Sequence, residues 1–213
     1  MLIAAMAVLD PGDEAWIEDP GFHQARRVFA LAGATIAPRP VDAEGIVIHG
    51  TRKGPPPKII YVTPSHQFPL GVTMSLKRRK ALLEFAQTRG AYILEDDYNA
   101  EFRFTGPPLP CLQGLDRTGR VIYAGTMSKI LYPSLRLGYL LVPAPLADAV
   151  AKLRTAMDQH SPTIAFSPVS LRITRSPGSN LARCPPHPLR SSAVAAMTAV
   201  KTLRVIIDLT RTR

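Results

Sequence analysis

A lysine and an arginine lie close together in residues 125–142, GTMSKILYPSLRLGYLLV. Lys129 lies in a turn of small residues that includes Thr126 and Ser128, and Arg136 follows seven residues later. The apolar runs VIYA and LGYLLV predict that two strands hold this loop between them. A primary amine, two hydroxyls and a guanidinium suit a ligand with both a carbonyl and a phosphate, because the amine can form a Schiff base while the others hold the anion. Pyridoxal 5'-phosphate (PLP) is such a ligand.

A second group of polar side chains follows the apolar run at residues 91–94, namely Glu95, Asp96, Asp97 and Tyr98. The run predicts a buried strand. In open α/β sheets ligands bind at the carboxyl ends of the strands, so these acids fall where a cofactor would lie. Asp96 and Asp97 are neighbours in an extended chain and must point to opposite faces, so only one of them can meet the ligand. The alternation does not say which of the two it is, but it places Tyr98 on the same face as Asp96.

The order of the predicted elements indicates the fold that positions these groups. The strand KIIYVT, the helix SLKRRKALLEFAQT and the strand AYILED predict a right-handed βαβ unit in an α/β fold, with a mostly parallel sheet flanked by helices. Ser75 is the predicted N-cap of this helix and Gly90 its C-terminal glycine. The basic run at residues 77–80 is expected on the solvated face of the helix rather than in a nucleic-acid patch.

Other strands are expected at AWIEDP, ATIAPRPVD, VIYAG and LGYLLVP, and other helices at FHQARRVFALAG and ADAVAKLRTAM. With 213 residues and 46% hydrophobic content, the chain can bury the core of one domain, or about one and a half. No apolar run approaches the ~20 residues that span a bilayer, and no secretory signal is evident, so we expect a cytoplasmic protein without a membrane partner. Two cysteines, Cys111 and Cys184, predict neither a disulfide framework nor a metal site.

The positive charge is concentrated in the last quarter of the chain. Residues 1–160 hold 18 basic and 15 acidic side chains (18 − 15 = +3), whereas residues 161–213 hold 8 and 1 (8 − 1 = +7). We therefore divide the chain into a near-neutral ligand-binding part, 1–160, and a basic tail rich in Ser, Pro and Arg, 161–213. The tail is either disordered or the product of a frame-shifted reading of the gene. Its basicity is poor evidence for DNA contact.

Three motifs together resemble a known family. In chain order they are TPSHQFPLG, ILEDDYNAEFRF and GTMSKILYPSLRLGYLLVP. The set is similar to the fold-type I, aspartate-aminotransferase-like PLP domain, and more narrowly to the version fused to a GntR-type DNA-binding domain in the MocR regulators. The resemblance covers about residues 1–160 and implies the large domain of fold type I. We expect that domain to be incomplete, because the family's upstream segment would precede Met1 and its C-terminal small domain is not recognisable.

The resemblance also implies a role for each matching residue. Lys129 would bind PLP covalently and, in an enzyme, move the proton of the substrate. Asp96 would pair with the pyridine nitrogen, and Tyr98 would hydrogen-bond the phenolic oxygen. The phosphate would be held by Arg136, Thr126 and Ser128.

Two further positions complete the implied site. Phe22, just after the strand AWIEDP, matches the residue that stacks on the PLP ring, where many members carry tyrosine. A plain core role for Phe22 stays open. In the loop after KIIYVTP, where the enzymes carry Asn-Pro, His66 and Gln67 occupy the neighbourhood of the phenolic oxygen, and we select His66 as the cofactor-binding residue.

Three functions are consistent with these observations. The chain is the PLP-binding, effector-sensing domain of a MocR/GntR-type transcription regulator, or a class I/II aminotransferase acting on amino acids, or a truncated remnant that binds nothing. The wording of the motifs favours the regulator over the enzyme, whereas the missing upstream segment and the unmatched tail favour the remnant over both. The expected small-molecule partner besides PLP is an amino-acid-like effector or substrate, and the family implies a homodimer. No DNA-binding motif occurs in this sequence, so DNA would be bound only through a missing N-terminal domain.

Overall fold

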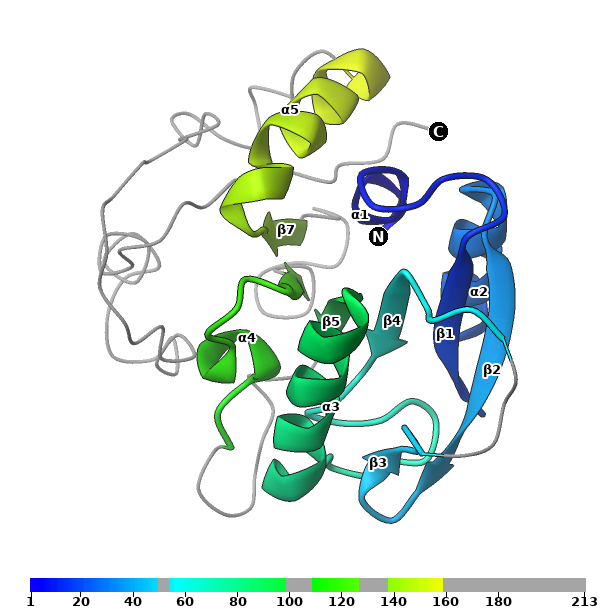
Figure 1. The fold of residues 1–213 in the computed structure, drawn as a ribbon, viewed down its shortest axis with the longest axis vertical. Helices are drawn as coiled ribbons and strands as arrows, with labels where there is room; N and C mark the ends of the chain where they lie inside the picture. The colour runs from blue at the N-terminus through cyan, green and yellow to red at the C-terminus, as the bar shows by residue number, and fades with distance from the viewer. Residues whose placement is uncertain (50–53, 99–108, 127–137, 159–213) are drawn as a thin grey trace.

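The fold is that of a computed structural model, which describes residues 1–49, 54–98, 109–126 and 138–158 (Figure 1). In this part of the chain seven strands form one sheet in the order β3-β2-β1-β4-β5-β6-β7. The five central strands are parallel, whereas β3 and β7 join the two edges in antiparallel pairs. The strands are β1 (Glu14–Asp19), β2 (Thr35–Asp42), β3 (Gly45–Ile46), β4 (Ile59–Val62), β5 (Tyr92–Asp97), β6 (Val121–Thr126) and β7 (Gly138–Leu141). The predicted α/β fold with a mostly parallel sheet is confirmed.

Helices cover both faces of this sheet (Figure 1). Of the helices in the described residues, three pack on one face and two on the other, which is the usual way for parallel strands to be buried on both sides. Among the described residues no helix is long and apolar enough to cross a membrane. The first face carries α1 (Leu2–Met6), α2 (His23–Leu31) and α5 (Ala144–Asp158), and the second carries α3 (Leu76–Arg89) and α4 (Leu112–Leu115).

The alternation of side chains along the strands divides the core into two clusters. On β5, Leu94 contributes to the cluster under α1, α2 and α5, while its neighbour Ile93 contributes to the cluster under α3 and α4. The same alternation separates Tyr61 from Ile60 on β4. Successive residues of a strand point to opposite faces, so a buried strand must be apolar on both sides. The side chains at the ends of these strands point alternately to the same two faces.

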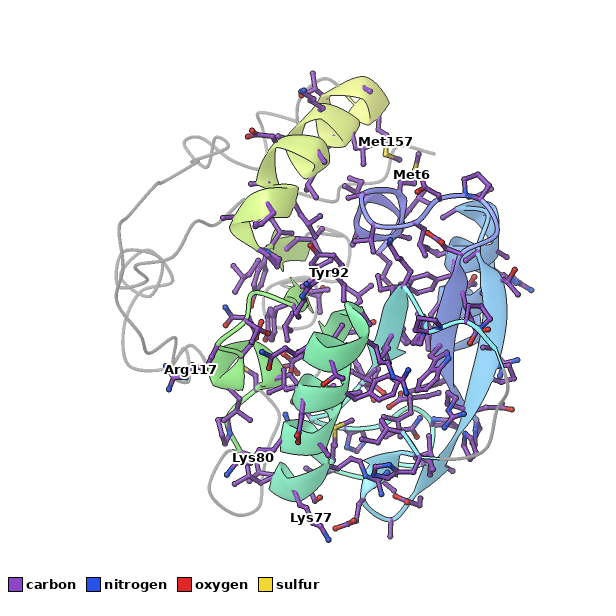
Figure 2. All side chains as sticks on the ribbon, in the orientation of Figure 1. Met6, Lys77, Lys80, Tyr92, Arg117 and Met157 are labelled. Atoms are coloured by element: carbon purple, nitrogen blue, oxygen red, sulfur yellow. The ribbon has the colours of Figure 1, made fainter. Side chains whose placement is uncertain are left out.

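The ends of α3 follow the prediction. The Ser75 hydroxyl accepts a hydrogen bond from the backbone N–H of Arg78 at 3.1 Å, and Gly90 ends the helix in the left-handed conformation at a φ of 69°. Lys77 and Lys80 lie on the solvated side, as expected (Figure 2).

For Arg79, however, the predicted solvated face is wrong. Its side chain is buried, because it lies on the helix face of Leu82 and Ala86, which packs on the sheet. The guanidinium donates hydrogen bonds to the carbonyls of Met74 and Pro64, and its Nη1 lies 3.8 Å from Oε1 of Glu95. These contacts supply partners for a charge that burial would otherwise make costly.

Candidate functional site

The carboxyl ends of four parallel neighbours, β1, β4, β5 and β6, lie along one edge of the sheet. Most of the predicted site residues belong to the segments that end there. Phe22 follows β1, His66 follows β4, and Thr126 ends β6. Asp96 lies in the last two residues of β5, and Tyr98 directly follows that strand. Loops at this edge of an open α/β sheet form the usual ligand site, because the strands fix their starting points.

Asp96 and Asp97 lie on opposite faces, as the alternation predicts. The hydroxyl of Tyr61, on β4, donates a hydrogen bond of 2.6 Å to Oδ2 of Asp96. The hydroxyl of Tyr123, on β6, donates one of 2.9 Å to Oδ2 of Asp97. Asp97 is buried, whereas Asp96 is half-buried. Of the two carboxylates, Asp96 is therefore the more accessible to a ligand.

Tyr98 and His66 lie together at this edge. The Tyr98 hydroxyl donates a 2.9 Å hydrogen bond to the backbone carbonyl of His66, and the two rings meet edge to face with centroids 6.3 Å apart. Burial, and then the charge of Asp96, raises the pKa of Tyr98 above its ordinary value. Its hydroxyl therefore stays protonated at neutral pH, and the one proton it carries is donated to the His66 carbonyl.

Phe22 is the residue before α2 and half-buried. Its ring meets that of Phe68 edge to face at 5.7 Å, so the segments after β1 and β4 touch through two aromatic side chains. The same ring packs against the core cluster under α2. Phe22 is thus in a position to offer a ring face at the edge of the sheet and is also anchored in the core.

Gln67 has a different role from its neighbour His66. The Gln67 side chain is buried, and its amide nitrogen donates to the carbonyls of Pro20 and Phe68 at 2.9 and 2.7 Å. Its amide oxygen accepts from the backbone N–H of Leu70. The amide therefore closes its own loop and ties that loop to the segment after β1, while His66 is exposed.

Glu18 is a polar residue of this edge that sequence reasoning missed. Its carboxyl group has no exposed surface, and Oε2 accepts hydrogen bonds from the backbone N–H and the hydroxyl of Thr63 at 3.2 and 2.7 Å and from the Gln67 amide at 3.3 Å. Burial raises the pKa of Glu18 to about 7. The available signal was an acid at the end of the strand AWIED, whose other residues are mostly apolar.

The charge of Asp96 influences the pKa of other ionisable groups at this edge of the sheet. The charge of Asp96 contributes to the raised pKa of Glu18, after the larger effect of burial. The amino group of Met1 is buried as well, and burial lowers its pKa while the charge of Asp96 opposes that shift. A cationic group placed against Asp96 would therefore also be attracted by an ionised Glu18.

Lys129, Ser128 and Arg136 lie outside the residues that the structure describes, as does the predicted tail at 161–213. The ends of the segment that carries the lysine and the arginine are described. Thr126 pairs with Gly138 in the antiparallel register of β6 and β7, and the preceding residue of β6, Gly125, pairs with Asp97 of β5.

A carboxylate, an aromatic ring, a hydroxyl and an imidazole therefore gather around one edge of the sheet, on Asp96, Phe22, Tyr98 and His66. This donor set fits a planar heteroaromatic ligand with a basic nitrogen and an oxygen substituent. The carboxylate would pair with the protonated nitrogen, the ring would stack, and the polar groups would meet the oxygen. PLP has these features.

Comparison with known proteins identifies the family. The model of the family "Aminotransferase class I and II" matches residues 1–174. The chain is 44% identical over 151 residues to the probable rhizopine catabolism regulatory protein MocR of Rhizobium meliloti, covering 71% of this chain and 30% of that protein. It is 50% identical over 139 residues to the uncharacterized HTH-type transcriptional regulator YdeL of Bacillus subtilis, covering 65% of this chain and 30% of that protein.

A solved structure has the same fold. It is that of LysN, an alpha-aminoadipate aminotransferase from Thermus thermophilus, complexed with N-(5'-phosphopyridoxyl)-L-leucine. The TM-score is 0.69 at 29% identity, and the match covers 77% of this chain and 44% of that one. The chain thus spans less than half the length of LysN and about a third of the length of the two regulators.

Proposed function

Because the chain belongs to the aminotransferase class I and II family, we propose that it binds PLP at the carboxyl edge of its sheet and serves as the effector-sensing part of a MocR-type transcription regulator. The observation that carries this proposal is the meeting of Asp96, Tyr98, His66 and Phe22 at that edge, beside the paired residues Thr126 and Gly138. The similarity to MocR and YdeL supports the regulatory role.

In this proposal Lys129 attaches the cofactor covalently, and its neighbours hold the phosphate. Arg136 presents a guanidinium fork that matches phosphate oxygens, and the hydroxyls of Ser128 and Thr126 add donors. Because Thr126 lies at the end of β6, it fixes one side of the phosphate position relative to the sheet.

Asp96 holds the ring nitrogen in its protonated form, and Phe22 covers one face of the ring. Tyr98 and His66 meet the phenolic oxygen from the segments that follow β5 and β4. Bound PLP would supply a carbonyl that captures primary amines and, in catalysis, an electron sink. A small molecule with a primary amine, such as an amino acid, is accordingly the class of effector that we expect.

DNA recognition and dimerisation belong to the same proposal. DNA would be bound through a separate winged-helix domain, as the HTH-type description of YdeL suggests. A second copy of the chain would complete the site.

A second candidate function is amino-acid transamination, favoured by the structural similarity to the aminotransferase LysN. The same residues would then act catalytically, with Lys129 as the proton carrier. An assay of amino-group transfer from a panel of amino acids to a 2-oxo acid separates the two functions. Turnover assigns an enzyme, whereas retention of PLP and of an amino compound without turnover assigns a sensor.

The proposed PLP site is tested by borohydride reduction of the purified chain after incubation with PLP, followed by peptide mass mapping. Reduction makes the bond between cofactor and lysine permanent, so we expect one labelled peptide, containing Lys129. The Lys129→Arg variant should lose the label, and the Lys77→Arg variant, altered on the solvated side of α3, should keep it. Labelling scattered over surface lysines, or none, would identify a remnant without a cofactor site.

A further inference from the structure

Two tyrosines hold the two aspartates of β5 in the same way from opposite sides. In the register of the sheet, Tyr61 of β4 is opposite Leu94, and its hydroxyl reaches Asp96, two residues further along β5. Tyr123 of β6 is opposite Glu95, and its hydroxyl reaches Asp97, again two residues further along. The two bonds are alike in geometry but lie on different faces, so the structure itself contains a matched pair of tyrosine–aspartate contacts.

We propose that Tyr61 is a positioning residue for the ligand-facing carboxylate, which it holds in the orientation needed to pair with a cationic ring nitrogen. This inference rests on the proposed PLP site. Tyr61 would not touch the cofactor and would act only through Asp96. The Tyr123–Asp97 contact, on the other face, would stabilise the fold without affecting the ligand.

The surroundings of Tyr61 suit this role. Its side chain is fully buried, and its ring meets that of Phe29 edge to face at 6.0 Å, so packing against α2 restricts the direction in which the hydroxyl points. Burial, and then the charge of Asp96, raises the pKa of Tyr61 well above its ordinary value. The hydroxyl therefore remains a donor throughout the working pH range.

Asp96 is the partner that needs such support. It lies in the last two residues of β5, still paired with Ala124 of β6, and is half-buried, so packing restricts its side chain less than it does in the core. A short hydrogen bond from a fixed donor to one carboxylate oxygen restricts rotation of the group, and binding then costs less entropy of ordering. Hydrogen bonds to charged groups are also stronger than neutral ones.

The test compares Tyr61→Phe with Tyr123→Phe, because each substitution removes one hydroxyl and keeps the ring. We expect Tyr61→Phe to weaken PLP binding about tenfold, the effect of losing one hydrogen bond to a charged group. Tyr123→Phe should bind PLP within about twofold of the unaltered chain. Urea unfolding followed by the fluorescence of Trp16, the single tryptophan, reports how much each variant is destabilised.

Two readouts separate positioning from a merely structural role. Tyr61→Phe should shift the pH at which the visible spectrum of bound PLP changes, whereas Tyr123→Phe should not. In the background of Asp96→Asn, Tyr61→Phe should have little further effect on affinity, because the two residues would act as one unit.

Equal losses of affinity in the two tyrosine variants would overturn the role of Tyr61, as would an undiminished effect of Tyr61→Phe in the Asp96→Asn background. Failure of the unaltered chain to take up PLP would instead remove the proposed function, and the role of Tyr61 with it.

Discussion

Glu18 should make the stability of this protein depend on pH in a direction opposite to that of most acidic side chains. Burial raises the pKa of Glu18 from 4.5 to about 7, so the folded state binds the proton more tightly than the unfolded state does. Folding is then favoured most below the unfolded pKa, where the group is neutral in both states. The advantage is lost as the pH rises through the folded pKa near 7.

The magnitude follows from the size of the shift. A rise in pKa from 4.5 to about 7, at about 1.4 kcal/mol for each pKa unit, amounts to about 3.5 kcal/mol once Glu18 is ionised in the folded state. Most of this cost should appear between about pH 5 and pH 8.5. The carboxyl group is fully buried, so screening by water should reduce this free-energy cost only slightly.

Glu18→Gln is the perturbation that isolates this effect. The amide oxygen can accept the bonds from Thr63 and Gln67 that Oε2 accepts now. The NH2 group takes the place of Oε1, for which the described residues offer no hydrogen-bond partner. The variant therefore resembles the protonated acid at every pH, and any cost of the unpaired amide is the same throughout the pH range.

The measurement is the free energy of unfolding in urea at several pH values, followed by Trp16 fluorescence. Between about pH 5 and pH 8.5 the variant should gain about 2–3 kcal/mol of stability relative to the unaltered chain. Glu95, whose pKa burial also raises to about 7, is present in both proteins and cancels in the difference. Glu84→Gln, on the exposed side of α3, is the matched control for replacing a carboxyl group with an amide. A difference for Glu18→Gln that is constant with pH would refute the reasoning.

Two substitutions test how the site is supported. Arg79→Met should cost about 1–3 kcal/mol in urea unfolding, because it removes the buried donor of hydrogen bonds to the carbonyls of Met74 and Pro64. Lys77→Met, on the solvated side, should change stability by less than about 0.5 kcal/mol. Similar values for both would contradict the buried role of Arg79. Gly21→Ala would bring a Cβ into collision with the backbone oxygen of Glu18, so the segment leading to Phe22 must move. We expect the free energy of unfolding to fall by about 1–3 kcal/mol and PLP uptake to weaken. An unchanged free energy of unfolding would show that the collision is relieved without cost.

Local patterns were sufficient to predict the elements that carry the site. The alternation along β5 placed Asp96 and Asp97 on opposite faces, and the capping residues Ser75 and Gly90 marked the two ends of α3. These signals depend on residues close together in the sequence, where periodicity and backbone preference act directly. The two-residue strand β3 was not predicted, because so short a segment has no period.

The partners of buried polar groups were beyond the reach of such patterns. Arg79 belongs to a basic run that suggests a solvated face, and only the packing of α3 on the sheet shows that it is buried. Glu18 meets Thr63 across 45 residues of sequence, and Tyr61 meets Asp96 across 35. Contacts of this kind depend on the order of strands in the sheet, which a single sequence does not specify. The hydrogen bonds of the buried Gln67 amide to Glu18 and Pro20 depend on the same strand order.

The strand order also explains why these polar groups gather where they do. From β1 the chain passes through α2 on one face to β2, and from β4 it passes through α3 on the other face to β5. The segments that follow β1 and β4 therefore leave the sheet toward opposite faces although the two strands are neighbours. In open α/β sheets ligands bind at such a reversal, because diverging segments leave room between them.

Here Glu18, Thr63 and Gln67 join the two strand ends just where their segments diverge. Phe22 continues from one of these segments and His66 belongs to the other, so a ligand bound between them would be contacted from both faces of the sheet. The hydrogen bonds among Glu18, Thr63 and Gln67 form a buried network that ties both segments to one carboxyl group. This network would then fix the distance between Phe22 and His66. A substitution in the network should therefore alter ligand affinity even though none of its three residues needs to touch the ligand.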